Sequence, residues 1–84
     1  MTRKQADMLA QSLRRKFGGE TEFEAVNKQG RYRFAIVSKR FNKMSQLKRQ
    51  DEVWKIVDQV LPRGASMDIS TILAYAPADL AEVK

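Results

Sequence analysis

The 84-residue sequence contains neither cysteine nor histidine, and these two absences exclude several classes of function. Without cysteine the chain forms no disulfide and offers neither a thiolate metal site nor a cysteine nucleophile. Without histidine it lacks the commonest general base near neutral pH and the commonest metal ligand. Glycine is also scarce, and its one pair, Gly18-Gly19, follows a predicted helix instead of preceding one as a phosphate-binding loop does. We therefore predict a protein that is not an enzyme and that has no cofactor and no metal site.

Long hydrophobic runs are missing as well. No apolar stretch approaches the roughly 20 residues that span a bilayer, and the start of the sequence, MTRKQADMLAQ, has no signal-peptide core. We expect a cytoplasmic protein that does not contact membranes. Its length predicts one domain over residues 1–84, and a chain of this size buries roughly 60–65% of its unfolded surface.

Two segments have the apolar spacing of amphipathic helices. The first is predicted from Thr2, as N-cap, to about Phe17, with the apolar stripe Ala6, Leu9, Ala10, Leu13 and Phe17. The second follows Ser45, also as N-cap, and ends at Pro62 and Gly64. Its stripe is Val53, Ile56, Val57, Val60 and Leu61, with Trp54 at the edge. A separate short helical turn is expected near residues 45–50.

Three strands are predicted, over residues 20–26, 31–37 and 67–75. The first turns Phe23 and Ala25 inward, and the second buries the face formed by Tyr32, Phe34 and Ile36. The turn 27–30 between them, Asn-Lys-Gln-Gly, predicts an antiparallel hairpin. In this hairpin Glu22 and Glu24 are expected to pair with Arg31 and Arg33. Residues 77–80 predict one last helical turn.

This order of elements, α-β-β-α-(α)-β, predicts an α+β fold with a three-stranded mixed sheet and helices packed on one face. The crossover through the long helix makes the third strand parallel to the second if the two are neighbours.

Positive charge is concentrated in one part of the chain. The net charge is +6, yet residues 31–49 alone carry seven basic residues and no acid. Five of them lie in the segment SKRFNKMSQLKR, residues 38–49, which we call the hinge because it connects the second strand to the long helix. Such a local excess suits a surface that faces an anion, although a solvated charged face has the same composition. The candidate nucleic-acid-binding residues are Lys39, Arg40, Lys43, Lys48 and Arg49.

The amino-acid sequence of the hinge resembles the signature of the BolA-like family. In that family a strand ends in Val-Ser, and a Phe, a short turn, a Ser and the triplet Arg-His-Arg follow. The matching residues here are Val37, Ser38, Phe41, Ser45 and Arg49. The stretch ISTILAYAPADL is similar to the family's third strand, with matches at Tyr75, Pro77 and Asp79. The resemblance covers most of residues 5–80 and implies a fold like a type II KH domain.

The resemblance also implies partners. Members of the family share an iron–sulfur cluster with monothiol glutaredoxins through histidine or cysteine, and the family is linked to transcription regulation and the stress response. Here Gln50 replaces the histidine of the triplet, Asp68 replaces that of the third strand, and the hairpin loop has no ligand. Lys43 lies near the place of the family's turn glycine. Since iron–sulfur ligation needs thiolate or imidazole, we predict no cluster, alone or shared.

Two functions remain open after these exclusions. The first is binding of DNA or RNA, DNA being favoured, through backbone contacts made by the basic hinge. A Gly-x-x-Gly loop, with which KH domains hold single strands, is not found between the predicted helices. The second is a protein-binding adaptor that keeps the fold, has lost the cluster chemistry, and engages an acidic partner or a glutaredoxin. For Phe41 a place in the core is favoured over base stacking, and Met44 is expected on the surface.

Overall fold

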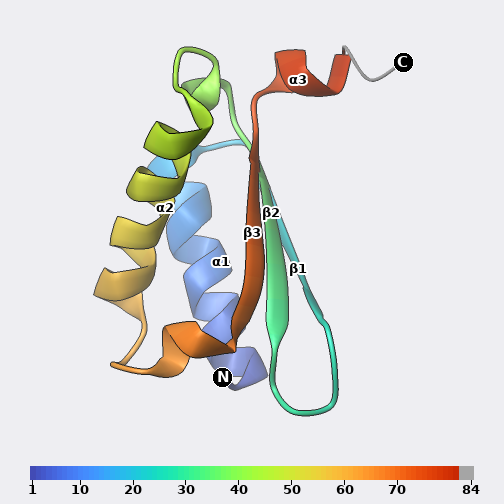
Figure 1. Ribbon diagram of the computed structural model, residues 1–84, viewed down its shortest axis with the longest axis vertical. Helices are drawn as coiled ribbons and strands as arrows, with labels where there is room; N and C mark the ends of the chain where they lie inside the picture. The colour runs from blue at the N-terminus through green and yellow to red at the C-terminus, as the bar shows by residue number, and fades with distance from the viewer. Residues whose placement is uncertain (82–84) are drawn as a thin grey trace.

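The computed structural model describes residues 1–81. Its helices and strands follow the predicted order (Figure 1), with bounds α1 (Arg3–Phe17), β1 (Glu20–Ala25), β2 (Tyr32–Val37), α2 (Gln46–Val60), β3 (Ile69–Tyr75) and α3 (Pro77–Ala81). Two short 3₁₀ turns, η1 (Lys39–Phe41) and η2 (Ala65–Asp68), lie at either end of the connection through α2.

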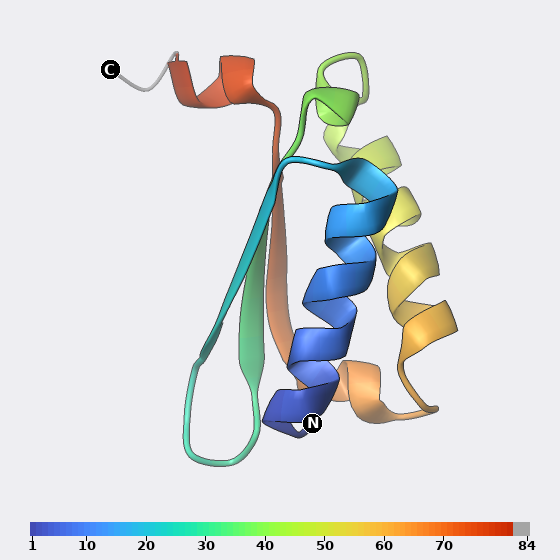
Figure 2. The same ribbon diagram turned by 180° about the vertical axis from the view of Figure 1, so that it is seen from behind.

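The strands form one sheet in the order β1-β2-β3. β1 pairs antiparallel with β2, and β2 pairs parallel with β3. Both long helices cover the same face of this sheet, and no other element among residues 1–81 covers the opposite face (Figures 1 and 2). The predicted α+β fold, with a mixed sheet and helices on one face, is confirmed. We call the uncovered side of the sheet the open face.

The core lies between the helices and the sheet. All five apolar stripe residues of α1 are buried, as are Val53, Val57 and Leu61 of the α2 stripe. From the sheet, Tyr32, Phe34 and Ile36 of β2 are buried as predicted. Ile56, Val60 and Trp54 pack at the margin of this cluster. The apolar spacing of the sequence therefore identified most of the core directly.

Capping residues set the ends of α1. The Thr2 hydroxyl accepts from the Gln5 backbone N–H at 3.1 Å, and the Gln5 side chain accepts from the Thr2 backbone N–H at 3.0 Å. At the other end the chain turns through Gly18 and Gly19, both with positive φ. A Cβ on Gly19 would lie 2.1 Å from the Val37 carbonyl oxygen, so only glycine lets this turn pass the end of β2.

The helical turn expected at residues 45–50 is not separate, and that prediction is wrong. α2 runs unbroken from Gln46 to Val60, and Ser45 caps it by accepting from the Lys48 N–H at 3.2 Å. No glycine or proline occurs inside this stretch to interrupt the helix. A separate turn does exist, but it is η1, where Ser38 caps the chain by accepting from the Arg40 N–H.

The first hairpin departs from expectation in two places. Ala25 is exposed and Thr21 is buried, so the inward face of this edge strand is covered near its start and not at its end. Arg33 lies opposite Glu24 and forms the expected ion pair with it, but Glu22 lies opposite Ala35 instead of a basic residue. The expected pairing of Arg31 is also absent from the ion pairs within residues 1–81.

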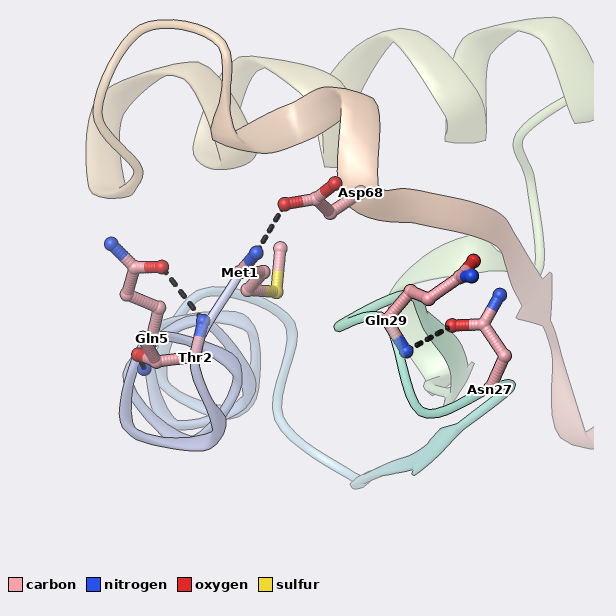
Figure 3. A network of polar contacts seen from close by, with 6 residues as sticks. All are labelled: Met1, Thr2, Gln5, Asn27, Gln29 and Asp68. Atoms are coloured by element: carbon pink, nitrogen blue, oxygen red, sulfur yellow. Dashed lines mark hydrogen bonds and ion pairs between the residues drawn. The ribbon is translucent and has the colours of Figure 1, made fainter.

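The connecting segments differ in smaller ways. In the hairpin turn the Asn27 side chain accepts from the Gln29 N–H at 2.9 Å, and only Gly30 takes a positive φ (Figure 3). β3 begins at Ile69, two residues later than predicted, because Met67 and Asp68 belong to η2. Met44 was expected on the surface, but it is half-buried against the core.

Candidate nucleic-acid interface

The hinge is anchored to the core by two side chains. Phe41 is fully buried, as predicted, and its ring centroid lies 4.9 Å from that of Phe17 at the end of α1. The Ser38 hydroxyl donates to the Phe17 carbonyl oxygen and accepts from the Arg40 N–H at 3.1 Å. The backbone of the hinge is therefore held in place, and the residues between these anchors project outward.

Three of the candidate cations are exposed and have no acidic partner in the part of the chain that the structure describes. Lys39 and Arg40 lie on η1, and Lys43 follows in the next turn. None of the three forms an ion pair within residues 1–81. Lys48 is also exposed, but its ammonium lies 3.5 Å from the Glu52 carboxylate one helical turn later. The hinge thus presents three unpaired cations and one that shares an acid.

Arg49, the fifth candidate, points inward and is only 5% exposed. Its Nε donates to the Met44 carbonyl oxygen at 3.1 Å, and its Nη1 donates to the Ala74 carbonyl oxygen at 3.2 Å. The same Nη1 donates to the Asp79 carboxylate at 2.7 Å. With its guanidinium also 5.8 Å from the Phe41 ring centroid, Arg49 ties the hinge to β3 and α3 and leaves four cations for a ligand.

Asp79 is the anionic partner in this network. Its carboxylate accepts from the Ala76 backbone N–H at 2.9 Å as well as from Arg49. The hydrogen bond from Ala76, followed by the bond and the charge of Arg49, holds the pKa of Asp79 below its usual range. The carboxylate thereby fastens the start of α3 to the start of α2. Arg49 and Asp79 both match the BolA-like pattern in the sequence, but nothing local in the sequence showed that they contact each other.

A shallow groove of about 430 Å³ lies beside the exposed cations. Its lining is partly apolar, with Phe17, Val37 and Pro77, and its charged lining residues are Lys39, Arg40 and the acidic Glu20. Sequence reasoning missed this groove, because its walls come from α1, β2 and α3. It gives the cations of η1 an adjoining apolar surface.

Neither a family model nor a curated protein sequence matches the chain. Solved structures do match. BolA1 from Arabidopsis thaliana superposes with a TM-score of 0.74 at 22% identity, over 89% of this chain and 94% of that chain. The fold is BolA-like. The solution structure of BolA1 from Mus musculus has a TM-score of 0.72 at 26% identity, over 93% of this chain and 69% of that one. The BolA domain of SufE1 from Arabidopsis thaliana has a TM-score of 0.70 at 20% identity, over 94% and 98%.

The iron–sulfur cluster implied by the resemblance does not fit the residues of this BolA-like chain. Gln50 uses its carboxamide inside the protein, donating to the Ile72 carbonyl oxygen at 2.9 Å and accepting from the Trp54 indole at 3.1 Å. Asp68 forms an ion pair with the amino group of Met1 (Figure 3). A carboxamide and a carboxylate are also poor donors for iron in a sulfide cluster, which prefers thiolate or imidazole.

We therefore expect no cluster absorption when the protein is mixed with a monothiol glutaredoxin and reconstituted with iron and sulfide, beyond the signal of the glutaredoxin alone. A Gln50→His, Asp68→His variant is the matched control, because it restores imidazole at both positions. A new visible band in the wild-type mixture that disappears in an Asp68→Ala variant would contradict the prediction.

Proposed function

We propose that this protein is a small, non-enzymatic member of the BolA family that binds DNA through the phosphates, with the hinge as its docking surface. The observation that carries the proposal is the set of unpaired cations Lys39, Arg40 and Lys43, held outward by the buried anchors Ser38 and Phe41. Lysine and arginine side chains in such a cluster are the usual ligands of nucleic-acid phosphates.

The same residues support binding that is independent of base sequence. Phosphate contacts fix the position of a protein on nucleic acid but carry no base information. Besides its cations the hinge exposes Leu47 and the polar residues Asn42, Ser45 and Gln46, and Phe41 is buried and unavailable for stacking on a base. No helix among residues 1–81 is long and apolar enough to cross a membrane. The cytoplasmic location remains a prediction.

The salt dependence of DNA affinity tests this proposal. Three or four phosphate contacts on duplex DNA give a log–log slope of affinity against salt of about −2.7 to −3.6. Replacing Lys39, Arg40 and Lys43 with Gln is expected to flatten the slope by about 2.7, roughly 0.9 for each lost contact. The loss should be nearly equal for unrelated DNA sequences. Fluorescence anisotropy with labelled duplexes at several salt concentrations measures both quantities.

A matched control separates the hinge from net charge. Replacing Lys4, Lys28 and Lys55 with Gln also removes three positive charges, but from exposed positions on α1, the hairpin turn and the middle of α2. This variant should keep most of the wild-type slope. A wild-type protein that fails to bind at low salt, or a control that loses as much slope as the hinge variant, refutes a docking site at the hinge.

A protein-binding adaptor is the second candidate, and one observation favours it. Leu47 is 74% exposed on the first turn of α2, next to the hinge cations. An exposed leucine beside charged residues has the arrangement of apolar centre and polar rim that protein interfaces show. A partner surface with an acidic rim and an apolar centre would contact both the hinge cations and Leu47. By the family resemblance this partner would be a monothiol glutaredoxin.

The two candidates respond differently to a change at Leu47. If a protein partner buries this side chain, Leu47→Ser should weaken its binding at least tenfold, because burial of a leucine contributes about 1.5–3 kcal/mol. DNA affinity should change little. Met67→Ser is the control, since Met67 is 77% exposed on η2, at the opposite end of α2 (Figure 1). Calorimetric titration with a glutaredoxin measures the effect, and equal losses in both variants would argue against the adaptor.

A further inference from the structure

The two edges of the sheet differ in their free backbone groups. At the β3 edge, Ser38 N–H donates to the Tyr75 carbonyl oxygen, so the odd-numbered residues of β3 face β2 and the even-numbered ones face away. The two outward carbonyl groups of Ile72 and Ala74 accept from Gln50 and Arg49 of α2. Side chains of α2 therefore occupy two acceptors of this edge and hinder the approach of another strand.

The β1 edge is closed at one end only. Val26 N–H donates to the Arg31 carbonyl oxygen at 2.8 Å, so the even-numbered residues of β1 face β2. Thr21, Phe23 and Ala25 then turn their backbone groups outward. The Thr21 carbonyl oxygen accepts from Arg14 at 2.6 Å. No side chain within residues 1–81 bonds the backbone of Phe23 or Ala25, and these groups form an open strand edge.

Negative charge runs along this edge on the open face. Glu20, Glu22 and Glu24 are exposed at every second position of β1. Glu24 is paired with Arg33, whereas Glu20 and Glu22 form no ion pair within residues 1–81. The strand thus combines unpaired backbone groups with a row of carboxylates, on a protein that is basic as a whole.

A hollow of about 200 Å³ on the open face adjoins these carboxylates. Glu22 and Glu24 lie on one side of it, and Ala35 and Leu73 form an apolar part, with Leu73 39% exposed. Arg33 also lines the hollow, and its charge is already paired with Glu24. Lysine and arginine side chains place an aliphatic stem on apolar surface and a cation beside an acid. With Arg33 paired to Glu24, the carboxylate of Glu22 is the one that favours a long basic side chain in the hollow over an acidic or a purely apolar one.

A second copy of this chain is a poor occupant of the edge. Antiparallel pairing of two β1 strands would bring their glutamates opposite one another, which is destabilising. Pairing of β1 with the β3 edge of another copy is hindered by Gln50 and Arg49. Nucleic acid is equally unsuited, because the row of glutamates repels its phosphates.

We propose that the β1 edge binds an extended basic segment of a partner protein, which adds a fourth strand to the sheet. The backbone of this segment would bond to Phe23 and Ala25, and lysine or arginine at every second position would lie over the open face beside Glu22 and Glu24. Strand addition of this kind draws affinity from main-chain hydrogen bonds and specificity from alternate side chains. The site is separate from the hinge and does not depend on the DNA-binding proposal.

Titration of the ¹⁵N-labelled protein with an acetylated, amidated peptide of four alternating Lys-Thr pairs tests the proposal by NMR. We expect the largest shifts at the amides of Phe23 and Ala25. A peptide of the same composition, with its lysines grouped in one half, should bind at least threefold more weakly, and one with Glu for Lys should not shift these amides. Glu22→Gln should weaken binding about two- to fivefold, and Glu22→Lys should abolish it.

Ala25→Pro tests the strand edge itself. The Ala25 N–H points away from β2, so proline removes a donor from the free edge and leaves the hairpin ladder intact. Affinity for the alternating peptide should fall at least tenfold, whereas Ala25→Ser, which keeps the N–H, should bind like the wild type. No binding by the wild type, equal binding by Ala25→Pro and Ala25→Ser, or shifts confined to other elements would overturn the proposal. If Ala25→Pro does not fold, unchanged affinity in Glu22→Lys overturns it.

Discussion

Val57→Asp is expected to unfold the protein at room temperature. Val57 is fully buried on α2, in the middle of the cluster that joins both helices to the sheet. An aspartate there would be charged without a partner or would have to take up a proton, and either state costs on the order of 4–5 kcal/mol. Native proteins have a total stability of about 5–15 kcal/mol, and a domain this small lies near the lower end of that range, so the substitution removes most or all of it. Far-UV circular dichroism and thermal melting measure the loss.

The control for this prediction lies two residues further along the same helix. Gln59 is exposed, so Gln59→Asp introduces the same carboxylate into water. It should cost at most about 1 kcal/mol, through the unfavourable position of an acid near a helix C-terminus. A melting temperature that is unchanged in Val57→Asp would mean that this face of α2 is not packed on the sheet.

Most of the fold could be predicted because its cause is local and periodic. The stripe from Ala6 to Phe17 repeats at helical spacing, and the alternation from Tyr32 to Ile36 repeats at strand spacing. Thr2 and Ser45 mark helix starts by their own hydroxyl groups. Each of these patterns depends only on neighbours within a few residues, and each is confirmed.

The errors arose where burial depends on distant parts of the chain. Ala25 alternates correctly with Glu24, but β1 is an edge strand, and Ala25 is exposed although its partner Tyr32 on β2 is buried. Met44 adjoins charged residues, yet the hinge folds back and half-buries it. Alternation predicts which side of a strand a residue occupies and does not predict whether anything covers that side.

The candidate site shows the same division between local and distant causes. The charge excess of the hinge is readable from the sequence, and Lys39, Arg40 and Lys43 are exposed as that interpretation requires. Arg49 has the same charge and the same neighbours, but it points inward. Its acceptors, the Ala74 carbonyl oxygen and Asp79, lie 25 and 30 residues further along the chain. No pattern in the hinge itself distinguishes the buried arginine from the exposed ones.

Arg49→Met is therefore expected to destabilise the protein, although the exchange removes a positive charge from a strongly basic segment. It leaves the carbonyl groups of Met44 and Ala74 and the Asp79 carboxylate without their donor. We expect a loss of about 3 kcal/mol, since each hydrogen bond to a charged group contributes about 1.5–3 kcal/mol and water can reach part of Asp79. For a domain of this size that lowers the melting temperature by about 12–24 °C.

Two further variants isolate the role of the guanidinium group. Lys48→Met removes the neighbouring charge and its exposed ion pair with Glu52, and should cost at most about 1 kcal/mol. Arg49→Lys keeps the charge but cannot donate in three directions from one planar group, so its stability should lie between those of the wild type and Arg49→Met. Equal melting temperatures for Arg49→Met and Lys48→Met would mean that Arg49 is solvated like its neighbour.

The titration of Asp79 provides an independent measurement of the same network. A carboxyl group whose pKa is lower in the folded than in the unfolded state stabilises the protein above its unfolded pKa, about 3.9 for aspartate. That stabilisation is lost as the pH falls through the lower, folded value. In Arg49→Met the pKa of Asp79 should rise toward the ordinary value without reaching it, because the larger influence, the Ala76 N–H, remains. Carboxyl ¹³C NMR follows this change, and a pKa that does not move on substitution of Arg49 would show that the two side chains are not paired in solution.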